Sequence, residues 1–171
     1  LPLLVSALAL ALAMTRLTFW LFQHPRFSSC LVVLPLLCNP FYLGNLTYQY
    51  DGPGMNLALV AVVYAITLRI EHVVWRGLVA AALIAVTLGL YQLTVGVFVG
   101  LCVVEFVVGV RNQVRAVELL GLLAQRVVQL IGGGILYVLT AYQWVTHDRG
   151  EWIPLNGAWG EAVAGRFTTA M

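Results

Sequence analysis

A polar and aromatic segment between two apolar stretches is the part of this sequence best suited to chemistry. Asp51 stands directly before Gly-Pro-Gly, and residues 1–69 contain no other acid. A carboxylate can accept the proton of an attacking hydroxyl group. Amide side chains hydrogen-bond to sugar hydroxyls, and aromatic faces cover the apolar side of a sugar ring. We therefore expect a sugar-binding cleft with Asp51 as the catalytic residue. The expected substrate-binding residues of this segment are Asn39, Asn45, Tyr48 and Tyr50.

Three further residues are candidates for substrate binding. Tyr91 and Gln92 interrupt a long apolar stretch, where they would donate hydrogen bonds to a sugar. Arg149 follows the last apolar stretch and would bind a phosphate. The three cysteines lack metal-ligand spacing, so we name no metal-binding residue, and the sequence does not identify a cofactor.

Structural interpretations remain open for all these residues. Tyrosines and tryptophans collect at the headgroup level of any membrane protein. Asp51 would equally serve as the cap of the helix that follows, since acids favour helix N-termini. Tyr91-Gln92 would equally be an interfacial turn, and Arg149 a solvated loop residue.

Composition determines the elements that must position these residues. The chain has 171 residues, of which 61% are hydrophobic and 9% charged, with a mean hydropathy of +0.93. A soluble domain carries about 25% charged residues. About 20 apolar residues suffice to cross a bilayer. We therefore predict an all-α, polytopic transmembrane helix bundle. No basic run with interleaved aromatics is present, which argues against nucleic-acid binding.

About six membrane segments are expected, at 1–14, 27–37, 55–68, two within 77–110, and 131–145. The stretch 77–110 would measure about 51 Å as one helix, too long for an ordinary crossing. We therefore divide it into a hairpin at Tyr91-Gln92. Residues 112–129 have the pattern of an interfacial amphipathic helix. The triplet Gly132-Gly133-Gly134 indicates either a break or a close helix contact.

Arginine placement predicts the orientation of the bundle. Three arginine clusters lie between residues 16 and 126, and the chain has no lysine. Under the positive-inside rule these clusters are cytoplasmic, together with the amphipathic segment 112–129. The loop 39–54 and the tail 147–171 then lie on the outer side. We expect residues 1–171 to form one multi-pass domain in a bacterial inner membrane. The chain begins within an apolar stretch, so we expect it to be a fragment of a longer protein.

Two motifs carry a family resemblance. The first is Asn39-Pro40-Phe41 … Asn45-Leu46-Thr47-Tyr48-Gln49-Tyr50-Asp51 … Met55, and the second is Leu90-Tyr91-Gln92 … Val97-Phe98 … Glu105-Phe106. In order and spacing they resemble the type II (GtrII-type) glucosyltransferases that modify bacterial O-antigen. The sequence departs from that pattern at Gly44 and Gln49.

The resemblance implies a GT-C-type membrane glycosyltransferase, of which this chain would be a part. Such an enzyme moves a sugar, here glucose, from a polyprenyl-phosphate donor to a glycan acceptor such as O-antigen in lipopolysaccharide. The transfer takes place at the outer face of the inner membrane. The family's leading catalytic acid is expected in an external loop that would precede Leu1.

Two other functions remain open, namely a transporter or flippase of lipid-linked sugars and a structural subunit without chemistry. A transporter places polar groups near the bilayer midplane, whereas most polar residues here gather at segment ends. Glu105 is the exception, and we expect it near the inner interface beside a polar helix neighbour.

Overall fold

The computed structural model describes residues 2–22, 25–38, 43–44 and 51–143. In these ranges the regular structure is helical, and no strand is present, which confirms the all-α class. The α-helices are α1 (Pro2–Leu21), α2 (Phe27–Val33), α4 (Gly52–Thr67), α5 (Val73–Leu90), α6 (Val95–Arg111) and α7 (Ala116–Tyr137). Shorter helical turns are η1 (Leu34–Leu36), η2 (Gln92–Thr94) and the π-helical η3 (Val138–Tyr142).

Four helical stretches are long and apolar enough to cross a membrane. They are Pro2–Leu21, Val73–Leu90, Gln92–Arg111 and Ala116–Tyr142. Large apolar side chains lie exposed along them, including Val74, Val117 and Leu139. In water such a surface would be unfavourable, whereas lipid tails accommodate it. The chain is therefore a multi-pass membrane protein.

Helix α4 is the centre of the bundle. It has only 16 residues, yet 11 of them are buried, because α4 packs against α1, α5 and α6. A helix that is apolar all round favours such a position. Helix α4 runs parallel to α1: Asn56 Nδ2 donates to Ser6 Oγ at 3.0 Å, and Arg16 Nε donates to Thr67 Oγ1 at 2.7 Å.

Helices α5 and α7 form the most extensive helix pair. They run parallel, with Ile84 facing Gly133 and Gly89 facing Ala141. A Cβ atom on Gly133 would lie 2.6 Å from Ile84 Cγ2 and 3.0 Å from the Ala81 carbonyl oxygen. The glycine therefore permits the close approach. Of the two alternatives for the glycine triplet, the close contact is confirmed, and the break is absent because α7 continues through it.

Several segment boundaries differ from those expected. The amphipathic residues 116–129 and the sixth apolar segment form one continuous helix, α7, rather than two elements. Helix α1 extends beyond residue 14 to Leu21, and the part-buried Arg16 head group within it hydrogen-bonds to Thr67 of α4. The hairpin at Tyr91-Gln92 is confirmed: Tyr91 has an extended backbone, with φ −157°, which ends α5.

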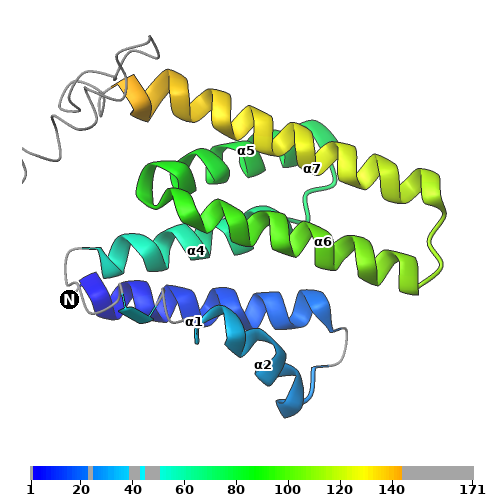
Figure 1. Ribbon diagram of the computed structural model, residues 1–171, viewed down its shortest axis with the longest axis horizontal. Helices are drawn as coiled ribbons and strands as arrows, with labels where there is room; N and C mark the ends of the chain where they lie inside the picture. Colours follow the sequence, from blue (N-terminus) through cyan, green and yellow to red (C-terminus); the bar gives the residue numbers. More distant parts are fainter. Residues whose placement is uncertain (1, 23–24, 39–42, 45–50, 144–171) are drawn as a thin grey trace, which may run out of the picture.

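The helix directions create two chemically different ends (Figure 1). Helices α1, α4 and α6 finish where α5 and α7 begin. This end, called the arginine end, carries Arg16, Arg69, Arg76, Arg111 and Arg115. The opposite end, called the aspartate end, carries Asp51, η2 and η3. Among the described residues, Asp51 is the only charged group at the aspartate end.

Candidate functional site

Asp51 occupies the N-cap position of α4 at the aspartate end. Its backbone carbonyl accepts a hydrogen bond from Met55 N at 3.0 Å, which starts the helix. Its side chain makes no capping hydrogen bond, and the residue is exposed. The backbone of Asp51 therefore belongs to the helix start, while its carboxylate remains available to a ligand.

Tyr91 and Gln92 lie at the same end of the bundle, where η2 packs against α4. Gln92 Nε2 donates a hydrogen bond of 2.8 Å to the hydroxyl of Tyr137, the last residue of α7. Tyr137 also makes an edge-to-face contact with Tyr142, with ring centroids 6.2 Å apart. The aspartate end thus combines a carboxylate, an amide and phenol groups, the groups that recognise neutral sugars.

Sequence reasoning did not identify Tyr137 as part of this end. The available signal was the spacing of Tyr137 and Tyr142, because a regular α-helix does not place residues five positions apart on one face. The π-helical turn Val138–Tyr142 follows Tyr137 directly. Such turns frequently occur at functional sites.

Five candidate site residues lie outside the described residues. They are Asn39, Asn45, Tyr48, Tyr50 and Arg149. The expected cleft between the loop 39–54 and the other candidates therefore remains a prediction. The outer placement of this loop and of the tail 147–171, and the inner placement of residues 112–129, also remain predictions.

An apolar pocket of about 490 Å³ opens between the N-terminal half of α1 and the start of α4. Leu3, Leu10, Leu37 and Leu43 line it, and Asn56 contributes one polar group. Asn56 is only 2% exposed and donates to Ser6. The pocket lies on the aspartate side of the bundle, and its apolar lining is suited to a hydrocarbon chain.

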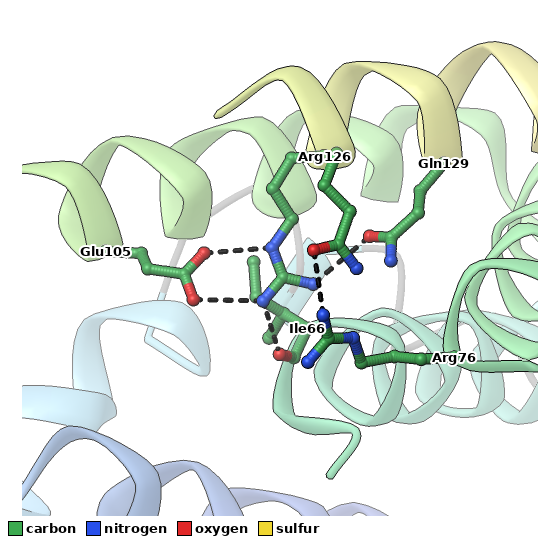
Figure 2. Close-up of polar contacts among 6 residues, drawn as sticks. Ile66, Arg76, Glu105, Arg126 and Gln129 are labelled. Carbon is green, nitrogen blue, oxygen red and sulfur yellow. Dashed lines mark hydrogen bonds and ion pairs between the residues drawn. The ribbon is translucent and has the colours of Figure 1, made fainter. Parts of the chain in front are cut away.

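A second polar group lies deeper, between α6 and α7 (Figure 2). Arg126 donates to both carboxylate oxygens of Glu105 at 2.9 Å, and the two side chains are 11% and 14% exposed. Arg126 also donates to the Ile66 carbonyl at 3.0 Å and to Gln129 Oε1 at 3.1 Å. This cluster joins α4, α6 and α7, and its bidentate geometry is that of a strong ion pair.

The expected polar neighbour of Glu105 is thus confirmed, and it is Arg126. Sequence reasoning assigned Arg126 to an inner arginine cluster and missed the pair. An available signal was the opposite charge of Glu105 and Arg126 within two successive apolar helices, since intramembrane charges pair with one another. No group of three or more potential metal ligands occurs among the residues that the structure describes.

Comparisons with known proteins agree with the motifs. The family model described as glucosyl transferase GtrII matches residues 1–145. An uncharacterized 55.3 kDa protein encoded in the gtrB 5′ region of Salmonella phage P22 is 27% identical over 92 residues. That match covers 54% of this chain and 19% of the phage protein.

No solved structure matches the chain significantly. The family match is independent of any single motif because it spans α1 to α7. It confirms the resemblance found in the two polar motifs. The chain belongs to the GtrII glucosyltransferase family.

Proposed function

We propose that this chain forms part of a membrane glycosyltransferase that moves a glucosyl group from a polyprenyl-phosphate donor to O-antigen or a related glycan. The observation that carries the proposal is the family match over residues 1–145. The reaction takes place at the aspartate end, which faces the outer side of a bacterial inner membrane. The arginine end then faces the cytoplasm, in keeping with the positive-inside rule.

Asp51 is proposed to accept the proton of the attacking acceptor hydroxyl. Its exposed carboxylate makes no capping bond and has no cation beside it among the described residues of that end. As the proton leaves, the hydroxyl oxygen attacks the anomeric carbon, and the bond from that carbon to the donor phosphate breaks. Asn39, Asn45, Tyr48, Tyr50, Tyr91 and Gln92 are proposed to orient the two sugars.

The donor is proposed to place its isoprenoid chain in the apolar pocket beside Asn56. The leucine lining of that pocket matches a hydrocarbon chain, and its position beside α4 brings a bound lipid toward Asp51. Arg149 is proposed to bind the phosphate, because no arginine lies at the aspartate end in the described part of the chain. Positive charge there would stabilise the departing phosphate.

The decisive experiment substitutes Asp51→Asn in the full-length protein and measures glycan transfer at matched membrane levels. Asn caps helices about as well as Asp. Loss of a general base should lower the rate about 10²–10⁴-fold. The matched control is Glu71→Gln, which neutralises an exposed acid at the arginine end and should leave transfer unchanged. Near-normal transfer by Asp51→Asn would exclude Asp51 as the base.

The Arg149 assignment has its own test. Arg149→Gln should raise the apparent KM for the polyprenyl-linked donor, because one charge-assisted bond to phosphate is lost. The apparent KM for the acceptor should stay the same. Unchanged donor kinetics in a normally inserted protein would show that Arg149 does not contact the donor.

A flippase of lipid-linked sugars is the second candidate, and the partly buried Glu105–Arg126 pair favours it. Charges inside membrane spans often mark a transport path. In a flippase, Glu105→Gln would abolish translocation of the lipid-linked sugar, and Asp51→Asn would leave that translocation intact. The closed bidentate geometry of the pair and the family match favour the transferase.

A further inference from the structure

We propose that a pocket at the arginine end binds the phosphate headgroup of an anionic phospholipid. The pocket measures about 470 Å³ and is lined by Arg16, Phe19, Trp20, Thr67 and Arg69. These residues come from the C-terminal parts of α1 and α4 and from the segment after α4. Two of the five lining residues are cations and none is an acid.

Arg16 is held in a fixed position at this pocket. Its Nε donates to Thr67 Oγ1 at 2.7 Å, and its Nη2 donates to the Thr67 carbonyl at 2.9 Å. Its guanidinium also lies 5.0 Å from the centroid of the Tyr64 ring. A guanidinium has five N–H donors, so three remain after these two bonds. Because the group is already ordered, binding an anion costs little additional side-chain entropy.

Arg69 supplies the second positive charge. Helix α4 ends at Thr67, and Leu68 has an extended backbone, which carries the chain away from the helix axis. Arg69 is exposed and has no hydrogen bond or ion pair with the described residues. Two arginines beside one pocket suit a phosphate, since guanidinium groups match its oxygens in a bidentate arrangement.

The remaining lining residues favour a lipid over a soluble anion. Phe19 is 58% exposed and Trp20 half-buried, and both precede the end of the membrane-spanning helix α1. Tryptophan side chains at such positions lie at the headgroup level. Basic pockets between membrane helices on the cytoplasmic side bind anionic headgroups. The apolar rings would contact the glycerol and the upper part of the acyl chains.

This site is separate from the proposed site of sugar transfer. Asp51 and Thr67 are at opposite ends of α4, whose 16 residues span about 24 Å. A donor phosphate positioned for reaction at Asp51 therefore does not reach Arg16. The bound phospholipid would instead hold the C-terminal ends of α1 and α4 together at the membrane surface. The inference does not depend on the glycosyltransferase assignment.

The test is native mass spectrometry of the purified full chain titrated with phosphatidylglycerol or phosphatidylcholine. Phosphatidylglycerol should bind more tightly, and Arg69→Gln should weaken its binding about fivefold, the factor that corresponds to about 1 kcal/mol per arginine near a membrane surface. Arg69 is exposed and has no hydrogen bond or ion pair with the described residues, so its substitution should leave the fold intact. The control is Arg111→Gln, an exposed arginine of the same end that does not line the pocket.

Several results would overturn the assignment. Equal losses of phosphatidylglycerol affinity in Arg69→Gln and Arg111→Gln would show that anionic lipid is attracted diffusely to the arginine end and has no specific binding site there. Displacement of phosphatidylglycerol by millimolar inorganic phosphate would show a site for a soluble anion. Equal binding of phosphatidylcholine would show that the arginines play no part. The double variant Arg16→Gln/Arg69→Gln should reduce phosphatidylglycerol binding to the level of phosphatidylcholine.

Discussion

The two ends of the helix bundle satisfy their polar groups in opposite ways. At the aspartate end the described contacts are between neutral groups, such as Gln92 with Tyr137, and the single carboxylate has no cation beside it. At the arginine end, guanidinium groups bind carbonyls, hydroxyls and carboxylates. Neutral donors and acceptors are suited to sugars, whereas fixed cations are suited to phosphates and to retention on the cytoplasmic side.

A partly buried ion pair lies between the two ends. The Glu105–Arg126 pair lies between them, about 9 Å along α6 from Arg111, because six residues separate Glu105 from the end of that helix. It is neutral as a pair, so it adds no net charge to the apolar interior. A lone charge is unfavourable by about 2.5–3.5 kcal/mol at the centre of a membrane-spanning helix, and the cost falls toward the helix ends.

The largest expected difference between the ends is their accessibility. Single cysteines at Thr47 and at Arg115, in a variant without the native cysteines, should react oppositely with an impermeant maleimide in intact cells. Position 47 should be labelled if the aspartate end faces outward, and position 115 only after the membrane is permeabilised. Labelling of position 115 but not 47 in intact cells would invert the proposed topology.

The second prediction tests the partly buried pair that lies between the ends. Arg126→Gln removes the ion-pair partner of Glu105, whose side chain is only 14% exposed. Removing one partner of a buried pair is unfavourable by about 3–5 kcal/mol, and we expect the lower end of that range for this partly buried pair. The matched control is Arg115→Gln, which removes the partner of Glu118 at the start of α7. This second ion pair is exposed, with side chains 85% and 51% accessible. Exposed pairs contribute about 0–1 kcal/mol.

The free energy of unfolding in detergent micelles is measured for Arg126→Gln and for Arg115→Gln. Equal, small losses of stability would show that Glu105 reaches water or a headgroup when Arg126 is absent. The double variant Glu105→Gln/Arg126→Gln should recover part of the lost stability, because no uncompensated charge then remains.

Sequence reasoning was most successful where composition and periodicity decide the outcome. The apolar segments predicted an all-α membrane bundle, and Tyr91-Gln92 predicted the hairpin, because two polar residues in a long apolar stretch interrupt the span. It failed where a tertiary contact decides. Helix α1 continues past residue 14 to Leu21, where Arg16 hydrogen-bonds to Thr67 of α4, and α7 runs unbroken through Gly133, which packs on Ile84 of α5.

The candidate site was predictable only in part. Residue type identified Asp51 and Gln92, yet only the structure shows that the Asp51 side chain makes no capping bond and that Gln92 bonds to Tyr137. The Glu105–Arg126 pair joins residues 21 positions apart, and helix register rather than local pattern brings them together. Such pairing depends on how α6 and α7 pack, which a single sequence does not specify.

The third prediction concerns the helix pair that runs from one end to the other. Gly133→Ala would bring a methyl group within 2.6 Å of Ile84 Cγ2, so α5 and α7 must separate or Ile84 must move. Overpacking of this kind lowers the free energy of unfolding by about 1–3 kcal/mol. The neighbouring Gly134→Ala meets no atom within 4 Å and should be neutral or slightly stabilising.

Thermal unfolding of the two alanine variants, side by side in the same detergent, measures the difference. If Gly133→Ala is as stable as Gly134→Ala, the close approach of α5 and α7 is absent. Transfer activity should follow the stability of Gly133→Ala only through the amount of folded protein.

The smallest expected effect is at the aspartate end and tests its neutral hydrogen bonding. Tyr137→Phe removes the hydroxyl that accepts from Gln92 Nε2 and retains the ring that contacts Tyr142. A hydrogen bond of this kind contributes about 0.5–1.5 kcal/mol, so unfolding in detergent should shift only slightly. If Gln92 binds a sugar, Tyr137→Phe leaves the Gln92 amide without the hydrogen bond that orients it. The KM for a sugar substrate should then rise, and kcat should stay nearly constant.

The comparison variant is Gln92→Leu, and the double variant Gln92→Leu/Tyr137→Phe completes a double-mutant cycle. Because both single variants remove the same bond, their effects on stability should not add. Additive effects would show that Gln92 and Tyr137 do not interact, and the aspartate end would then lack the contact that joins η2 to α7.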